Sequence, residues 1–381
     1  MVGLKTRSPR THSLVVGAGM VALVVAASSC ARFDDSLASP FEPEPTAGAY
    51  AHIQPSEPED EDSDEEREID GPCVDPDPAV IATCLEPISG VTVLPAGDAA
   101  LAAERVTGRI LLVGPDIEPE EFVQIPVDSS GDGGLLDIAL SPTFAEDRLL
   151  YALITTPSDN RVVRITPGDV PKVVLAGIPR GQTGNQGSLM FEQAGTLLVR
   201  TGDAGNAASS ADPASLAGKA LRVGALNPDG SDRPVIVASG LRGTGGACVD
   251  PVSQTVYVTE SSLAGDRLVR VSSDGSTEAL WSWTDGEGAG HCVVVGTDIA
   301  VVLSQGEAVS FLTRDDDTGL ISGDPAMAAE GRFGKLHGAA LGLGGEIWSG
   351  TINKASGDPG ETDDRVVLIP TDGGGGAVGP D

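Results

Sequence analysis

The stretch Gly134-Leu-Leu-Asp-Ile-Ala-Leu-Ser-Pro142 is a glycine, an apolar run and a turn, which is the pattern of a short strand that leaves a loop. Two further apolar runs follow, at residues 149–154 and 160–165, and the second begins with Asn160 and Arg161 after a short turn. Apolar runs of this length, separated by turn residues, predict consecutive antiparallel strands.

The same unit recurs along the chain. One clear copy opens at Gly246 and closes with Asp266-Arg-Leu-Val-Arg-Val271, and another opens at Gly338 and closes with Asp364-Arg-Val-Val-Leu-Ile369. Weaker copies open at Gly90, Gly187 and Gly290. Six openings at intervals of roughly 45–60 residues predict an all-β, six-bladed β-propeller, which closes a ring and hides its sheet edges. A β-sandwich is the competing architecture, but it does not explain a sixfold repeat.

The composition favours many short strands and excludes one class of partner. The chain has 381 residues, of which 24 are basic and 56 acidic, and its formal net charge is −32. Such a surface repels nucleic acid, so we expect no nucleic-acid partner. Glycine accounts for 50 residues and aromatic residues for only 3%, which favours turns and strands over a helical bundle.

The first 29 residues have the pattern of a bacterial lipoprotein signal peptide. Lys5, Arg7 and Arg10 precede an apolar run at residues 14–27, which is too short to span a membrane as a mature helix. The run ends in small residues before Cys30. We therefore expect Cys30 to be lipidated and to anchor the chain at the extracytoplasmic face of the cell membrane. An ordinary signal peptide with an incidental Cys30 is the alternative.

Residues 30–72 are predicted to be a disordered tether that begins at the lipidated cysteine. The segment is rich in acids and prolines, and residues 57–70 are nearly all acidic. Self-repulsion and low hydrophobicity favour an extended spacer that holds the domain off the membrane. Binding of a cation or a partner is the alternative role. The propeller domain is then expected at residues 73–381.

Four cysteines remain after Cys30. An even number in an exported protein implies two disulfides, and four cysteines allow three connectivities. We favour the local pairing Cys73–Cys84 with Cys248–Cys292, because the first would fix the start of the domain. The second would join equivalent positions on the inner strands of two neighbouring repeats.

Several stretches, in order along residues 90–370, resemble the glucose/sorbosone dehydrogenase family. Gly133-Gly-Leu-Leu-Asp-Ile-Ala-Leu-Ser-Pro142 is similar to the family pattern G-G-L-L-G-I-A-x-x-P, and Asn160-Arg-Val-Val-Arg164 to N-R-V-x-R. The small residues before Cys30 and the stretch Thr351-Ile-Asn-Lys354 also resemble those of actinobacterial lipoproteins grouped with that family. The other matching stretches are Thr201-Gly-Asp203, Ser215-Leu-Ala-Gly-Lys219, Asn227-Pro-Asp-Gly230, Gly240-Leu-Arg242, Tyr257-Val-Thr-Glu260 and Thr351-Ile-Asn-Lys354.

The resemblance implies a six-bladed propeller that oxidises sugars with pyrroloquinoline quinone (PQQ) and calcium. It implies cofactor contacts at Asn185, Arg242 and Lys354. The family's catalytic base is a histidine in H-N-G-G, and the matching residue here is Gly184, which cannot accept a proton. The asparagine after the family's G-L-R is also replaced, by Gly243.

Three other residues are candidates for the missing base. Asp132 stands where the family has a Gln or Glu near the cofactor, and His291 and His337 fall near the starts of inner strands, close to one mouth of the channel. Hydrogen-bonded structural histidines are the alternative for the last two. The remaining histidines, His12 and His52, belong to the signal peptide and the tether.

Three functions follow from these observations. The favoured one is an envelope lipoprotein that binds a sugar or an envelope protein on a dehydrogenase-like propeller without the catalytic histidine. The alternative is an active PQQ-dependent sugar or aldose dehydrogenase that uses another base. The third is a metal-dependent, lactonase-like propeller with Asp132, Asn185 and Asp203 around one cation.

Overall fold

The computed structural model describes residues 73–192, 195–231, 233–356 and 359–371. The predicted signal peptide at 1–29, Cys30 and the predicted tether at 30–72 lie outside the described residues. Within the described ranges, no helix has the length and apolar content needed to cross a membrane.

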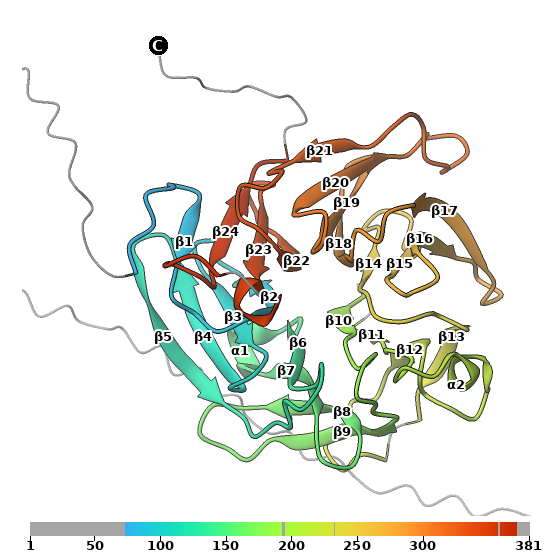
Figure 1. Cartoon of the computed structure of the whole chain (residues 1–381). Coiled ribbons are helices and arrows are strands. Elements are labelled where there is room, and N and C mark those ends of the chain that lie inside the picture. Colours follow the sequence, from blue (N-terminus) through green and yellow to red (C-terminus); the bar gives the residue numbers. More distant parts are fainter. Residues whose placement is uncertain (1–72, 193–194, 232, 357–358, 372–381) are drawn as a thin grey trace, which may run out of the picture. The chain divides into compact units, whose positions relative to one another are not determined.

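Six antiparallel sheets of four strands each surround a central axis, so the prediction of an all-β, six-bladed propeller is confirmed (Figure 1). Each blade runs from an inner strand at the axis to an outer strand at the rim. Blade 1 contains β2 (Ile88–Val93), β3 (Ala100–Glu104), β4 (Arg109–Gly114) and β5 (Ile117–Gln124). Blade 2 contains β6 (Leu135–Leu140), β7 (Leu150–Thr155), β8 (Asn160–Ile165) and β9 (Lys172–Ile178). Blade 3 contains β10 (Ser188–Phe191), β11 (Leu197–Arg200), β12 (Lys219–Val223) and β13 (Val235–Ser239).

The second half of the ring follows the same order. Blade 4 contains β14 (Ala247–Val249), β15 (Val256–Glu260), β16 (Asp266–Val271) and β17 (Thr277–Trp283). Blade 5 contains β18 (Ala289–Val295), β19 (Asp298–Leu303), β20 (Ala308–Thr313) and β21 (Ala326–Ala328). Blade 6 contains β22 (Leu336–Leu341), β23 (Ile347–Thr351), β24 (Val366–Ile369) and, as its outer strand, β1 (Val80–Ala82) from the start of the domain.

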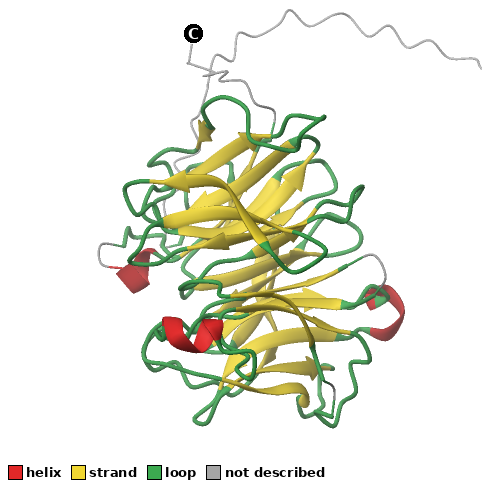
Figure 2. Ribbon diagram, turned by 90° about the vertical axis from the view of Figure 1, so that its right-hand side faces the viewer, coloured by secondary structure: helices red, strands yellow, loops and turns green. Residues whose placement is uncertain are grey.

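The apolar core lies between the blades. Six buried clusters each join one blade to its neighbour, as where Leu153 of blade 2 packs with Leu221 of blade 3. All six residues of β7 are buried, because its two faces meet two different blades. Outside the strands, the structure has only short helices in the connecting loops of the described residues (Figure 2).

The ring is closed by pairing between the two ends of the domain. β1 pairs antiparallel with β24, with Val80 opposite Val367. The disulfide Cys73–Cys84 encloses β1 in a loop. An ion pair of 2.7 Å between Arg332 and Asp77 adds a contact from blade 6 to the same segment. The N-terminal strand is therefore fixed on both sides.

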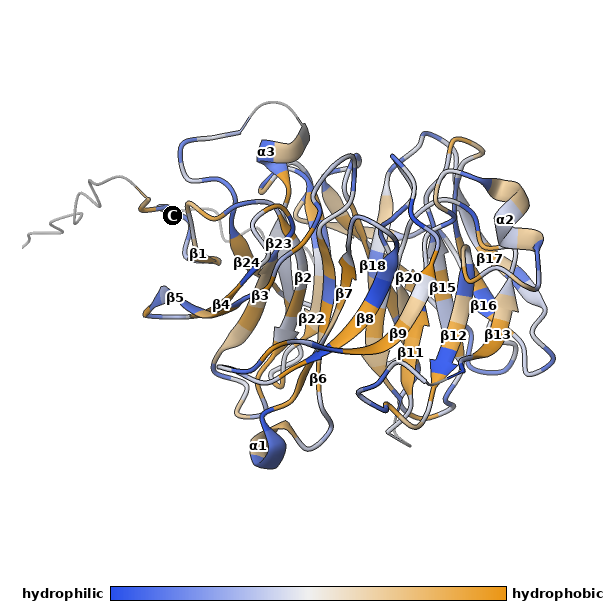
Figure 3. Ribbon diagram, turned by 90° about the horizontal axis from the view of Figure 1, so that it is seen from below, coloured by the Kyte–Doolittle hydropathy of each residue, from blue (hydrophilic) through white to orange (hydrophobic). Residues whose placement is uncertain are grey.

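The connecting loops define two faces. Inner strands start at the face that carries α2 (Ala207–Ala211) and α3 (Asn353–Ser356), and they end at the face that carries α1 (Phe144–Asp147) (Figure 3). We call these the α2/α3 face and the α1 face. The second disulfide, Cys248–Cys292, joins inner strands β14 and β18 near the axis, with 5.5 Å between the Cα atoms.

Replacing Cys73 and Cys84 together by serine tests the closure. The sequence separation of the pair is 11 residues. Loss of a loop of that size is expected to lower the free energy of unfolding by about 2–3 kcal/mol. Chemical denaturation measures the loss, and hydrogen exchange locates it, with faster exchange expected first at β1 and β24. Equal destabilisation of all six blades would contradict closure at this pair.

Candidate functional site

The residues predicted to form a site occupy two places in the fold. Asp132, Gly184, Asn185, Asp203 and Arg242 lie in loops of blades 1–4 on the α2/α3 face, and Lys354 lies in α3 on the same face. The two histidines come from inner strands β18 and β22 at the axis.

Asp132 caps the turn that carries Gly184. Its carboxylate accepts a hydrogen bond of 2.7 Å from the backbone N–H of Gly184. It also accepts bonds from the backbone N–H and the side-chain amide of Asn185. The carboxylate therefore organises the turn between blades 2 and 3, and a proton-accepting role would have to compete with these three bonds.

Asn185 is buried and its amide is fully used. Its Nδ2 donates to Asp132 and to the carbonyl of Gly181, and its Oδ1 accepts from Asn160 Nδ2 at 3.0 Å and from the N–H of Gly181 at 2.8 Å. A primary amide has two donors and two acceptor positions. In this arrangement Asn185 has no hydrogen-bonding position left for a cofactor.

Gly184 has no room for a side chain. Its φ is +75°, a conformation that favours glycine. A Cβ atom there would overlap the backbone nitrogen of Gly205 and would lie 2.6 Å from Oδ1 of Asp203. The loop after β11 therefore fills the space that a histidine would need at this position.

Asp203 and Arg200 hold that loop against the next one. Asp203 accepts bonds from the N–H groups of Gly205 and Gly243, both at 2.8 Å. The buried guanidinium of Arg200 donates to the carbonyls of Arg242, Gly243 and Thr244. Burial lowers the pKa of Arg200 to about 10, so it remains charged at neutral pH. Both oxygens of Asp203 accept hydrogen bonds from the protein. This disfavours the lactonase-like hypothesis, in which Asp203 would bind a cation.

Arg242 and Lys354 are the retained cations, and the structure does not bring them together. The side chain of Arg242 lies 3.4 Å from Glu260, which also binds Arg267. The ammonium of Lys354 donates to the carbonyl of Leu85 at 2.7 Å. The two residues follow strands of blades 3 and 6, which face each other across a six-bladed ring, and both side chains are about one-third exposed.

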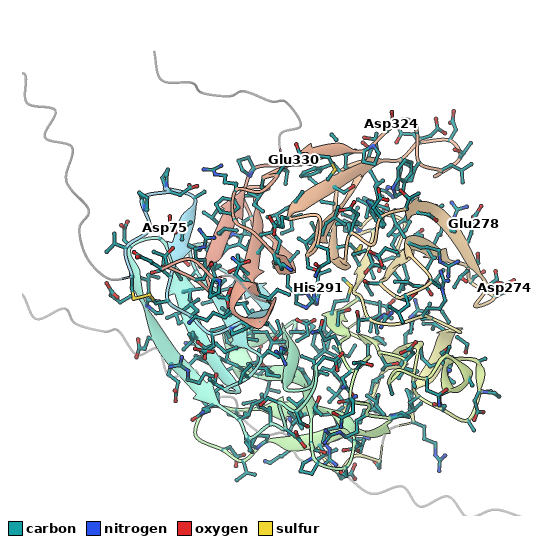
Figure 4. All side chains as sticks on the ribbon, viewed as in Figure 1. Asp75, Asp274, Glu278, His291, Asp324 and Glu330 are labelled. Carbon is teal, nitrogen blue, oxygen red and sulfur yellow. A yellow bond between two sulfur atoms is a disulfide. The ribbon has the colours of Figure 1, made fainter. Side chains whose placement is uncertain are left out.

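The two histidines lie inside the channel, although the sequence placed them near its mouth. His291, which is labelled in Figure 4, is 6% exposed and His337 is 8% exposed. Their ring centroids are 5.4 Å apart. Burial lowers the pKa of His337 to about 3, so it is neutral at pH 7. Neither is a constituent of the loop network around Gly184.

Sequence reasoning missed two buried charged residues. Arg200 ends an apolar strand, and its role depends on carbonyls more than 40 residues away, which no local pattern reveals. Asp137 lies 3.3 Å from His291 and is buried at the axis. A signal for Asp137 was present: it is a charged residue in the middle of an apolar strand, where the pattern G-G-L-L-G-I-A has glycine. Among the described residues, no group of three or more His, Cys, Asp or Glu side chains is placed to hold a metal ion.

Comparisons with known proteins agree on one family. A family model described as Glucose / Sorbosone dehydrogenase matches residues 85–276. The aldose sugar dehydrogenase YliI of Escherichia coli K12 is 26% identical over 167 residues, covering 38% of this chain and 45% of that protein. An uncharacterized Synechocystis protein is 32% identical over 221 residues, covering 47% of this chain and 53% of that protein. The chain thus spans about half the length of the curated relatives it matches.

Solved structures extend the likeness over the whole propeller. The PQQ-bound aldose sugar dehydrogenase of Streptomyces coelicolor has a TM-score of 0.69 at 28% identity, over 76% of this chain and 96% of that one. An oxidoreductase of Thermus thermophilus, described as a glucose dehydrogenase, has a TM-score of 0.68 at 26% identity, over 76% of this chain and 98% of that one.

Gly184→Ala tests whether this position is closed. The variant should lose about 2–4 kcal/mol of folding free energy, because the methyl group meets backbone and the φ is positive. Gly168→Ala is the matched control, since Gly168 has a φ of +82° but nothing within 4 Å of the added atom. Thermal or chemical denaturation compares them, and equal losses would mean that the space at Gly184 is open.

Proposed function

Because the chain belongs to the glucose/sorbosone dehydrogenase family, we propose that it is a member whose catalytic position is closed and which serves the cell envelope as a binding module. Its ligand is a sugar or an envelope protein. The observation that supports this proposal is the turn at Gly184, where the loop of Asp203–Gly205 occupies the space that a side chain at this position would need.

The other candidate bases support the same conclusion. A general base must reach the proton that it removes from the substrate. Asp132 holds three N–H groups of the turn, and His291 and His337 are buried in the channel. None of the three combines a free proton-accepting atom with exposure on the α2/α3 face.

The donor set also does not fit PQQ as a catalytic cofactor. PQQ carries three carboxylates, so its site needs several cations and free hydrogen-bond donors. Arg242 is shared with Glu260, and the ammonium of Lys354 is engaged by the carbonyl of Leu85. Asn185, the third residue implied by the resemblance, has no spare bond.

An active PQQ-dependent dehydrogenase is the second candidate. It is favoured by the partial exposure of the side chains of Arg242 and Lys354, and by the likeness to the PQQ-bound aldose sugar dehydrogenase of Streptomyces coelicolor. It requires the loops around Gly184 to rearrange on binding, since the present contacts leave no base in place.

The expected site of action follows from the N-terminal sequence. We propose that Cys30 is acylated and that residues 30–72 tether the propeller to the extracytoplasmic face of the cell membrane. The binding face would then meet other envelope components at a distance set by this acidic, proline-rich segment.

Quinone titration distinguishes the two candidates. With calcium present, we expect calorimetry to show no saturable binding of PQQ to the full chain. We also expect the chain to oxidise no aldose in a dye-linked assay. The Escherichia coli aldose sugar dehydrogenase serves as the positive control, and Gly184→His should gain no turnover. Sugar oxidation by the wild-type chain would overturn the proposal. Saturable binding without turnover would retain the binding module and identify the quinone as its ligand.

Cys30→Ala tests the anchor. In the native host, the wild-type chain should remain in the membrane fraction after a high-salt wash, and mass spectrometry should find an acyl group on its first residue. Cys30→Ala should leave that fraction, whereas Ser29→Ala should behave as wild type. A mature chain that starts elsewhere and carries no lipid would contradict the anchor.

A further inference from the structure

The channel between the six inner strands holds a cavity of about 410 Å³. All six inner strands line it, mainly through residues from the middle of each strand to its C-terminal end, so it runs from the axis toward the α1 face. Its size is in the range of small-molecule sites. The cavity is therefore separate in position from the loops of the α2/α3 face.

Close approach of the inner strands narrows the channel at the end of the cavity that lies farther from the α1 face. A Cβ atom on Gly246 would lie 2.7 Å from the Cα of His291, and one on Gly338 would lie 3.0 Å from the Cα of Gly90. At the same level, the pairing register shifts in four inner strands, β2, β6, β18 and β22. Such irregularities change the direction of side chains, and here they accompany Asp137 and His291 at the floor of the cavity.

The floor carries polar groups without partners. Neither ring nitrogen of His291 has a hydrogen-bond partner within the described residues, although only 8% of the side chain is exposed to solvent. Its Nε2 lies 3.3 Å from Oδ2 of Asp137, which is ion-pair distance without hydrogen-bond alignment. Oδ2 of Asp137 accepts the N–H of Leu189 at 2.7 Å. Buried polar atoms without partners are costly, so they mark a place where a ligand would be stabilised.

The charge of the floor selects a cation. In the part of the chain that the structure describes, Asp137 is the only acidic residue that lines the cavity, and no Lys or Arg lines it. His337 packs edge-to-face against His291 and is not among the residues that line the cavity, and burial keeps it neutral. An anion would meet an uncompensated carboxylate, whereas a cation would pair with it. The chain's net charge of −32 also attracts cations at long range.

The apolar walls of the cavity favour a ligand whose larger part is apolar. Between the floor and the α1 face, the cavity is lined mainly by aliphatic and aromatic side chains, and Leu341 at its outer end is 40% exposed. The larger apolar wall residues include Val93, Leu140, Phe191, Val249 and Val293.

We propose that the channel is a binding site for a small organic ammonium ion. The ammonium group meets Asp137 and His291 at the floor, and the apolar part of the molecule fills the channel toward the α1 face. This site is independent of the proposed function of the α2/α3 face.

Three probes of equal chain length test the proposal on the full chain: hexylamine, 1-hexanol and hexanoate. Calorimetry should show hexylammonium binding roughly tenfold or more tighter than either of the others, because only it pairs with the buried carboxylate. Labelling the imidazole Cε1 of histidine with ¹³C gives one signal for each histidine of the chain that is measured. Hexylamine should shift the signal of His291, assigned with His291→Gln.

Asp137→Asn removes the charge and keeps the size, and it should weaken hexylammonium binding by roughly tenfold or more while leaving 1-hexanol unchanged. Thr92→Val, in the same wall, is the matched control and should bind hexylammonium as wild type does. Should Asp137→Asn fail to fold, the comparison of three probes on the wild-type chain decides alone. Equal affinity for 1-hexanol, tighter binding of hexanoate, or no saturable binding would overturn the proposal. Zn²⁺ binding that requires both residues and excludes hexylamine would overturn it in favour of a metal site.

Discussion

The close approach of the inner strands at the ring axis is the constraint on which the rest of the structure depends. At one level of the axis neighbouring inner strands nearly touch, and Gly246 and Gly338 allow backbone to meet backbone there. A larger residue at either position would push neighbouring blades apart. The narrowing also divides the axis into a level of tight contact and a cavity on the α1 side, so the two faces can carry different chemistry.

On the α2/α3 face, acidic side chains act mainly as acceptors for backbone N–H groups. Asp132 binds the turn at Gly184, and Asp203 joins its own loop to Gly243 in the next one. Arg200 supplies the complementary donors to the carbonyls of that loop. Because each of these groups is engaged by the backbone, they hold the loops together, and Asp132, Asp203 and Arg200 have fewer hydrogen-bonding positions left for a ligand.

The sequence predicts the ring well and the site only in part, for a physical reason. Strand length, turns and the recurring glycine are local, so six blades could be counted before any contact was known. The repeat pattern did not predict strand β1, because β1 completes blade 6 from the other end of the domain. The roles of Asn185 and Arg200 depend on partners in other loops, and the burial of His291 depends on five other blades, so no pattern along the chain contains them.

The geometry around Gly184 limits which side chains this position can carry. A histidine there would need a different backbone conformation, since φ is +75°, and it would also need the segment Asp203–Gly205 to withdraw. That segment is bonded to Gly243, which is itself bonded to Arg200. Placing a histidine at this position therefore requires coordinated changes in three loops rather than one substitution. By contrast, a single charged side chain at position 137 is enough to give the channel a polar floor, because the apolar walls and the narrowing are already required by the ring.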